Sequence, residues 1–414
     1  MTGSHHNEHW RQNLYVCLFG SFTTIIAMTL ILPFLPLYVE QLGVSEPAAI
    51  VQWSGVAFSV TFFAASLVSP IWGRLADRYG RKLMLVRASL GMAIVMSLIG
   101  LAHNIYQLVG LRLAIGLAGG YASGSIILVA MQTPRDRSTW ALGTLSIGTM
   151  AGSFVGPLLG GILPGLIGLR ETFFAAGAAI FVAFLATCFL IREARVAPPA
   201  AKRPGTRRIG TWAAIADRRP VFAMLATALM LMFANMSIEP IITVYVAQLV
   251  DDPGRIALMS GLVMAASALA SILAAPRVGR LADRIGAWRV VIGCLVASGL
   301  LLIPQAFVTD AWQLVLLRFL MGLSLAGLLP SVTALIRHSV PDTVTGGVLG
   351  YSQSAQYMGQ IAGPLMGGFA GAHFGMRSVF FATSVLMLGG AVANWLVFRS
   401  LSRSPAEPQL EKRA

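Results

Sequence analysis

Long apolar stretches recur along the whole 414-residue chain, and short polar or charged segments separate them. A helix needs roughly 20 apolar residues to cross the hydrocarbon layer of a membrane. The pattern therefore predicts twelve membrane-spanning helices. They lie near residues 13–38, 51–72, 82–102, 105–130, 140–165, 170–192, 220–247, 256–276, 287–308, 311–335, 346–371 and 376–399.

The composition supports lipid as the solvent for much of this surface. Hydrophobic residues make up 56% of the chain and charged residues only 11%. A soluble protein of this length has too small a core to bury so much apolar surface. The first stretch is longer than the apolar core of a signal peptide and has no small-residue cleavage site after it, so we expect it to remain as helix 1.

The formal net charge is +14, which raises the possibility of a nucleic-acid partner. The positions of the 30 Lys and Arg residues argue against it, because all but five fall on one side of the predicted spans. This is the positive-inside pattern, and it predicts that both termini are cytoplasmic. The exceptions are Arg170, Arg255 and Arg377 on the opposite side, and Arg112 and Arg318 inside spans.

An internal repeat fixes the architecture. The segment Pro70-x-x-Gly73-Arg74-Leu75-Ala76-Asp77-Arg78-x-Gly80 recurs 206 residues later, as Pro276-x-x-Gly279-Arg280-Leu281-Ala282-Asp283-Arg284-x-Gly286. The same shift carries Arg112 onto Arg318, and a shift of 207 carries Tyr38 onto Tyr245. We expect these two copies to form the loops between helices 2 and 3 and between helices 8 and 9.

The repeat divides the chain into two six-helix bundles. They cover residues 1–192 and 220–414, and the proline- and arginine-rich segment 193–219 reads as a cytoplasmic linker. Two parallel halves that enclose a site at the membrane midplane are typical of alternating-access transporters.

The segment Gly73-Arg74-Leu75-Ala76-Asp77-Arg78-Tyr79-Gly80-Arg81-Lys82 resembles the signature between helices 2 and 3 of the major facilitator superfamily. Closer similarity, at Leu32-Pro33-Phe34-Leu35-Pro36-Leu37-Tyr38, is to its drug:proton antiporters. The resemblance implies an all-α membrane protein with the twelve-helix major facilitator fold in two pseudo-symmetric bundles. It also implies proton-driven export of amphipathic small molecules from the bacterial cytoplasm through the inner membrane, and we expect a monomer.

The first copy of the repeat is a candidate gate. A carboxylate at Asp77 can face the positive N-terminal end of a helix that starts on the same side, and helix 11 near Thr345-Gly346 is the natural partner. Asp283 would face helix 5 near Ser138-Thr139. These contacts would hold the cytoplasmic side shut in the outward-open state. The alternative is a solvated turn whose charges only fix the topology. The predicted gating residues are Gly73, Asp77, Arg78, Gly80, Arg81, Lys82 and Asp283.

Helix 5 carries glycines at every fourth position, at Gly148, Gly152 and Gly156, followed by Pro157. Such spacing leaves one helical face without side chains and lets another helix approach closely. In the family it resembles the antiporter motif of drug exporters, which implies a role at the interface between the halves. Helix 11 repeats part of the pattern, so close packing alone also accounts for it.

Ionisable residues inside membrane spans are functional candidates by default. Arg112 matches a family position linked to proton movement or substrate binding, and Arg318 is its copy. Glu239 is the one carboxylate clearly within a predicted span, and it is the candidate for binding and releasing a proton. The alternatives are that the arginines bond to carbonyls and that Glu239 lies near the outer mouth. Arg87 and Arg289, at inner helix ends, are interpreted as membrane anchors.

By the family resemblance, helices 1, 4, 7 and 10 line the central cavity. Aromatic and amide side chains there suit amphipathic ligands, because they offer contact area and a few hydrogen bonds without demanding a fixed charge. Helix packing is the competing role for each of them. The candidate substrate contacts are Tyr38, Tyr121, Asn235, Tyr245, Arg318, Gln353, Gln356 and Tyr357.

No pattern in the sequence predicts an enzyme, a metal site or a cofactor. Cys17, Cys188 and Cys294 have unrelated spacings, the histidines are scattered, and no phosphate-binding motif of ATP-driven pumps occurs. Two other functions stay open. One is a porter of organic anions or metabolites, because Arg112 and Arg318 would bring positive charge to the cavity. The other is a membrane sensor that transports nothing.

Overall fold

The computed structural model describes residues 9–193, 215 and 217–403 of the chain. Most of the predicted linker lies outside these residues. The first half contains α1 (Trp10–Thr29), α2 (Leu35–Gln41), α3 (Pro47–Tyr79), α4 (Arg81–Ile99), α5 (Ile105–Ala118), α6 (Tyr121–Gln132), the 3-10 turn η1 (Arg135–Arg137), α7 (Ser138–Ile167) and α8 (Leu169–Leu190). The second half contains α9 (Arg219–Ala247), the 3-10 turn η2 (Pro253–Arg255), α10 (Ile256–Ile285), α11 (Ala287–Gln305), α12 (Ala311–Leu325), α13 (Leu328–Ser339), α14 (Asp342–Phe374) and α15 (Met376–Arg403).

These fifteen α-helices make the twelve predicted crossings, because three of the spans are interrupted. The first breaks into α1 and α2 around Pro33, the fourth into α5 and α6, and the tenth into α12 and α13. At the break in the fourth span, Gly120 has a φ of 109°, a backbone conformation that favours glycine. By length and apolar composition, ten described helical segments qualify as membrane spans. The two predicted spans outside that set are the first, which is broken early, and α14, which is rich in Gly, Ser and Gln.

The repeated Gly-Arg-Leu-Ala-Asp-Arg segments are helical, so the prediction that they form loops is wrong. They are the last turns of α3 and α10, which extend beyond the apolar stretch. The chain reverses only at Gly80 and Gly286, whose φ values of 98° and 93° end the helices. Asp77 and Arg81 still form an ion pair of 2.6 Å across this turn.

The repeat found in the sequence is also present in the packing. The Tyr38 hydroxyl donates to the Ile99 carbonyl at 2.6 Å, and the Tyr245 hydroxyl donates to the Gln305 carbonyl at 2.9 Å. Each tyrosine also packs against a phenylalanine, with ring centroids 4.9 Å apart for Phe173 and 5.2 Å apart for Phe380. The two halves are therefore built on the same interior contacts.

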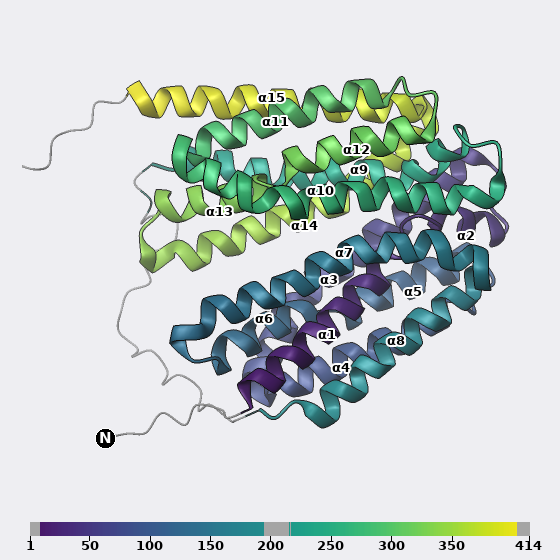
Figure 1. The fold of residues 1–414 in the computed structure, drawn as a ribbon, viewed down its shortest axis with the longest axis horizontal. Helices are drawn as coiled ribbons and strands as arrows, with labels where there is room; N and C mark the ends of the chain where they lie inside the picture. Colours follow the sequence, from purple (N-terminus) through teal and green to yellow (C-terminus); the bar gives the residue numbers. More distant parts are fainter. Residues whose placement is uncertain (1–8, 194–214, 216, 404–414) are drawn as a thin grey trace, which may run out of the picture.

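The two halves meet at the end of the molecule that carries α2, which we call the α2 end (Figure 1). There α3 packs on α14, and α7 packs on α10. A Cβ added to Gly55 would overlap the carbonyl oxygen of Pro364, and one on Gly261 would overlap that of Pro157. The Ser59 hydroxyl donates to the Ile361 carbonyl at 2.7 Å, and the Thr243 hydroxyl donates to the Pro33 carbonyl at 3.1 Å. Backbone thus lies against backbone across this junction.

At the opposite end, which we call the basic end because it carries both Gly-Arg-Leu-Ala-Asp-Arg segments, the halves separate (Figure 1). A Cβ added to Gly73, Gly143, Gly279 or Gly346 would meet no atom within 4 Å. These glycines lie on α3, α7, α10 and α14, the helices that are in close contact at the α2 end. The molecule is therefore open toward the side that the charge pattern predicts to be cytoplasmic.

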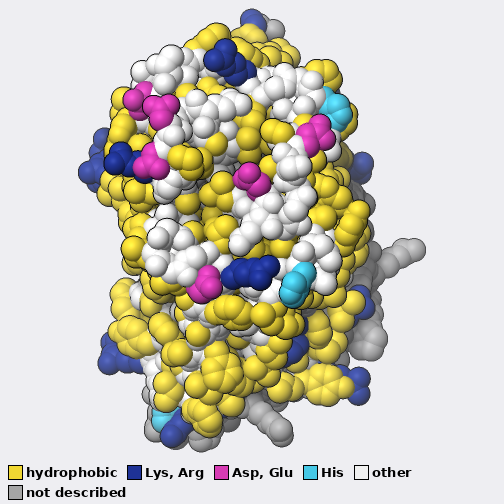
Figure 2. Space-filling model, turned by 90° about the vertical axis from the view of Figure 1, so that its right-hand side faces the viewer, with side chains coloured by type: hydrophobic (Ala, Val, Ile, Leu, Met, Phe, Trp, Pro, Cys, Tyr) yellow, Lys and Arg dark blue, Asp and Glu magenta, His cyan; other side chains and the backbone are white. Residues whose placement is uncertain are grey.

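The charges on the two ends differ in sign. Figure 2 views the α2 end, where acidic side chains gather among apolar and small ones and basic side chains are scattered. The acidic residues at or near helix ends on this side include Glu40, Glu46, Glu171, Asp252 and Asp310. The described chain begins and ends at the other, basic end (Figure 1).

We predict that Gly55→Leu shifts the protein away from this conformation, because the new side chain cannot fit against the carbonyl of Pro364. Thiol labelling of a cysteine introduced at Gly350, in the open basic end, should slow several-fold. Gly110→Leu is the matched control, since its Cβ meets no atom within 4 Å. Unchanged labelling in the Gly55 variant would mean that this junction does not select the conformation.

Candidate functional site

Arg112 lies in the interior of the first half. Its side chain is 1% exposed, and its Nε donates to the Ala57 carbonyl at 3.3 Å. The guanidinium carbon lies 5.2 Å from the ring centroid of Phe58, a cation–π contact. The Nη1 atom is buried and has no hydrogen-bond partner in the described residues. A single carbonyl and an aromatic face thus hold this charge, and one donor group stays available.

Arg318 occupies the equivalent place in the second half, but its surroundings differ. It is 5% exposed, and both its Nε and its Nη2 are buried without a partner among the described residues. Its charge interacts with the carboxyl group of Glu239 on α9, although the two groups are too far apart for a direct ion pair. The shift of 207 places Leu32 at the position of Glu239, so the first half has no such carboxylate.

Glu239 is half-buried and lies eight residues before the end of α9, about 12 Å along the helix from the α2 end. The helix continues through Pro240, whereas the equivalent Pro33 lies where α1 and α2 separate. Thr243, one turn further on, joins the other half through its bond to Pro33. The carboxyl group is therefore below the closed junction, and the opposite charge that acts on it is that of Arg318.

Four of the predicted substrate contacts lie on α9 and α14, two helices that pack along each other. Asn235, Gln353 and Gln356 have no hydrogen-bond partner among the described residues, and their polar atoms are not buried. Tyr357 is half-buried on the same helix as the two glutamines. These are neutral polar groups with free hydrogen-bonding capacity, which is the character expected of a cavity lining.

Besides Arg318, three predicted contacts lie inside the bundles. Tyr38 and Tyr245 are 0% and 2% exposed, and each donates to a backbone carbonyl. Tyr121 is 1% exposed, and its hydroxyl lies 2.6 Å from that of Thr187. In this conformation all three serve helix packing, and their contact with a substrate stays a prediction.

The glycine stripe of α7 packs inside the first half, which differs from the role at the interface between the halves that the family resemblance implied. A Cβ on Gly148 would lie 3.2 Å from the Leu18 carbonyl, and one on Gly152 would lie 2.9 Å from that of Phe22. Gly156 faces Thr29 in the same way, so the stripe lies against α1. Pro157 is the member that reaches the other half, through Gly261.

The described residues do not form the contacts predicted for a gate at Asp77 and Asp283. The Asp77 side chain is 70% exposed, and its ion-pair partner is Arg81 of the next helix. Asp283 has Ala287 in place of that arginine, as the sequence indicated. Glu193, which sequence reasoning missed, accepts hydrogen bonds from the backbone N–H groups of Arg81 and Lys82, both at 2.9 Å. This carboxylate caps α4 and attaches the end of the first half to the turn that follows Asp77.

Arg87 binds the backbone at the break in the fourth span, so it is not a simple membrane anchor. Its guanidinium carbon lies 3.6 Å from the ring centroid of Trp72, and its nitrogens donate to the carbonyls of Leu117 at 3.2 Å and Gly119 at 2.9 Å. Trp72 Nε1 also donates to Leu117 at 2.9 Å. Helix ends leave unpaired carbonyls, and these two side chains satisfy them. Arg289, in contrast, is exposed.

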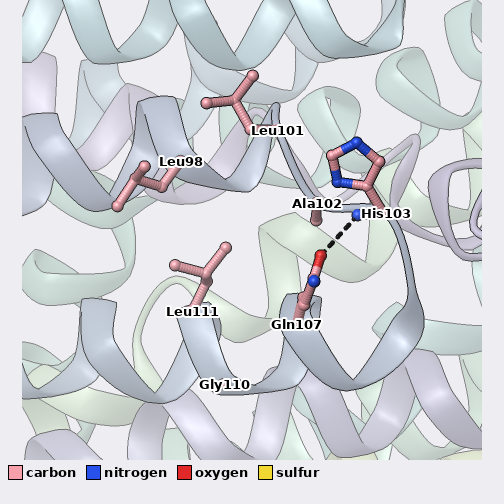
Figure 3. A pocket seen from close by; sticks show the side chains of 7 residues that line it. All are labelled: Leu98, Leu101, Ala102, His103, Gln107, Gly110 and Leu111. Carbon is pink, nitrogen blue, oxygen red and sulfur yellow. Dashed lines mark hydrogen bonds between the residues drawn. The ribbon is translucent and has the colours of Figure 1, made fainter.

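A separate recess of about 450 Å³ lies at the α2 end between α4 and α5 (Figure 3). Its lining is mostly apolar, with Leu98, Leu101 and Leu111 facing it. Gln107 Oε1 accepts from the backbone N–H of His103 at 2.8 Å, so the main polar group at its edge is already used. This recess contains no buried charge and is not the candidate site.

Comparison with known proteins gives a consistent assignment across the chain. The family described as Major Facilitator Superfamily matches residues 17–253 and 251–414. The multidrug resistance protein MdtG of Proteus mirabilis is 41% identical over 397 residues, which covers 96% of this chain and 98% of that protein. MdtG of Dickeya zeae is 44% identical over 393 residues, covering 95% of this chain and 96% of the relative.

Solved structures share the fold at low sequence identity. A bacterial homologue of the human lysosomal transporter Spinster, in an inward-facing and occupied conformation, matches with a TM-score of 0.77 and 17% identity, and the match covers 98% of this chain and 100% of that one. The nucleoside transporter NupG matches with a TM-score of 0.72 and 16% identity, over 95% of this chain and 99% of its own. These similarities concern the fold alone.

We predict that Arg87→Met destabilises the protein, because the carbonyl of Gly119 loses its donor and Trp72 loses its cation–π partner. The loss should be roughly 2 kcal/mol, and it would be measured as a lower midpoint of thermal unfolding in detergent. Arg289→Met removes the same charge from an exposed position and should change the midpoint little. Equal effects of the two substitutions would contradict the role assigned to Arg87.

Proposed function

The chain belongs to the major facilitator superfamily, and from this membership we propose that it exports amphipathic small molecules across the bacterial inner membrane in exchange for protons. The observation that carries the proposal is the half-buried carboxyl group of Glu239 beside the unpartnered, buried Arg318, below a closed α2 end and toward an open basic end. The relatives that the chain resembles are named multidrug resistance proteins, which supports drug-like molecules as the cargo.

Proton exchange in this proposal takes place on Glu239. In the outward-open state the carboxyl group takes a proton from the outer side. In the state described here it releases that proton toward the cytoplasm, and its negative charge then acts on Arg318. A bound cargo and a bound proton would therefore favour opposite states, which is the coupling that an antiporter needs. Arg112, which has no carboxylate partner among the described residues, would serve as a fixed charge in the first half.

Alternation between the two states is proposed to use the ends of α3, α7, α10 and α14. Closure of the basic end would bring Asp77 to the N-terminus of α14 near Thr345, and Asp283 to that of α7 near Ser138. An aspartate is stabilised at such a helix end by the macrodipole. The exposed side chain of Asp77 supports this movement, and so does Gly73, because an added Cβ there would meet no described atom within 4 Å.

The cargo is proposed to contact Asn235, Gln353, Gln356 and Tyr357. Their amide and hydroxyl groups are neutral and have unused hydrogen bonds. Such a surface binds molecules that differ in shape and present a few polar groups on an apolar body. It does not demand a negative charge from the cargo, and Glu239 reduces the positive potential that Arg318 would otherwise create.

We predict that Glu239→Gln abolishes proton-coupled transport, because the amide cannot release a proton. Inverted membrane vesicles would be given a lipophilic dye and an acidic lumen, and dye uptake and proton release would be followed together. Glu40→Gln, which changes an exposed carboxyl group at the α2 end, is the control and should transport normally. Dye-driven proton release by the Glu239 variant would rule that residue out as the coupling site.

We predict that Asp77→Asn slows transport about tenfold while the protein still inserts and folds, since a partly buried carboxylate at a helix N-terminus contributes up to about 2 kcal/mol. Asp283→Asn should have a smaller effect, because the second copy has no counterpart of Arg81. Initial rates of dye efflux, normalised to the amount of folded protein, give the comparison. Full activity of the Asp77 variant would remove the gate.

A further inference from the structure

A second groove, unrelated to the transport path, runs along the C-terminal half between α9 and α15. Its volume is about 800 Å³, within the range of about 300–1,000 Å³ that is usual for small-ligand sites. Phe222, Ala226 and Met230 line it from α9, and Val385, Gly389 and Ala393 line it from α15. Apart from the residues at its mouth, its walls are nearly all apolar.

The groove faces lipid. Phe222 is 55% exposed and Val385 is 70% exposed, and both lie within predicted membrane spans. Gly389 leaves open space, since an added Cβ there would meet no atom within 4 Å. A hydrogen bond joins the two helices at the floor of the groove, because Asn394 Nδ2 on α15 donates to Thr227 Oγ1 on α9 at 2.9 Å. The groove is therefore already formed in the protein alone.

The mouth of the groove is cationic. Arg218 and Arg219 line it at the basic end, and both are exposed. Neither guanidinium group has an ion pair or a hydrogen bond with the described residues. The neighbouring Asp217 accepts from the backbone N–H of Arg219 at 2.9 Å, so one of its oxygens is used in capping α9. Two adjacent cations without a side-chain partner in the described part of the chain therefore lie above an apolar channel.

The dimensions match one leaflet of a membrane. From Arg219 to Met230 the groove follows eleven residues of α9, about 16 Å at the rise of a helix. Half of the hydrocarbon thickness of a bilayer is about 15 Å. An acyl chain that begins at the level of the arginines would therefore end near Met230. Basic pockets between membrane helices on the cytoplasmic side suit anionic lipid headgroups.

We propose that this groove binds an anionic phospholipid of the leaflet at the basic end. Its phosphate lies between Arg218 and Arg219, and one acyl chain lies along the channel past Gly389. This site differs from the proposed cargo surface on α9 and α14 and does not depend on the proposed transport function. The helix α9 also carries Glu239, on which proton exchange is proposed. A lipid bound in the groove would therefore attach this helix to the leaflet.

The test measures binding of phosphatidylglycerol and of neutral phosphatidylcholine to the purified full-length protein by native mass spectrometry. The unchanged protein should prefer phosphatidylglycerol. The double variant Arg218→Gln with Arg219→Gln should bind it about 30-fold more weakly, at about 1 kcal/mol for each basic residue. Arg289→Gln with Arg337→Gln removes the same charge from exposed positions at the basic end and should leave the affinity unchanged.

A second variant separates the groove from surface charge. Gly389→Leu fills the channel and keeps both arginines, so this variant should also lose its binding of phosphatidylglycerol. If the Gly389 variant misfolds, Ala226→Leu fills the same channel from the α9 side and serves as the test instead. Equal binding of the two lipids, or equal losses in the two double variants, would overturn the proposal. So would full binding by a folded, groove-filled variant. Free glycerol phosphate should not compete with the lipid, and competition would indicate a site for soluble anions.

Discussion

The contact of backbone with backbone at the α2 end is the constraint on which the rest of the structure depends. Gly55, Gly161 and Gly261 let α3 and α7 approach α14 and α10 so closely that no side chain fits between them. In a membrane such close approach, together with a few hydrogen bonds, replaces the hydrophobic driving force that is missing between helices in lipid. The same four helices separate at the basic end. In the proposed transport cycle, closure of that end would therefore open the α2 end. The half-buried Glu239 lies just below the closed end, where a change at the junction would alter its access to either side.

The two halves share a frame but not their chemistry. The tyrosine bonds to Ile99 and Gln305, and the glycine contacts of α7 with α1 and of α14 with α9, recur almost residue by residue. The charged groups do not recur. Glu239 corresponds to Leu32, Arg81 to Ala287 and Arg87 to Gly293. The Asp77–Arg81 ion pair and the helix break bound by Arg87 therefore belong to the first half, and the carboxylate within a span belongs to the second. Duplication accounts for the scaffold, and these substitutions account for what each half can do.

The sequence alone was sufficient for the twelve spans and the two related halves, because hydrophobic length and an exact repeat are local properties of the chain. It was insufficient for contacts that depend on where helices end. The motif around Asp77 was predicted as a loop, although the helix continues to Gly80. Arg87 was interpreted as an anchor, because its partners are distant in sequence: Trp72 lies on α3 and Gly119 lies at the break between α5 and α6. Tyr38, Tyr121 and Tyr245 were predicted as ligand contacts because aromatic side chains suit such a site. Only the tertiary structure shows that they are buried inside the bundles and form hydrogen bonds there. No motif or repeat in the sequence pointed to Glu193 as a capping residue.

The central claim is that this fold exports amphipathic compounds in exchange for protons through the path between its halves. Reconstitution of the purified protein into liposomes with an acidic lumen tests it most directly, with a lipophilic cationic dye and an organic acid offered separately from outside. The account predicts that the dye accumulates, that protons leave the lumen as it does so, and that both fluxes stop when the pH gradient is removed. Uptake of the organic acid in preference to the dye would identify a porter of anions, and no flux of either solute would identify a protein that does not transport.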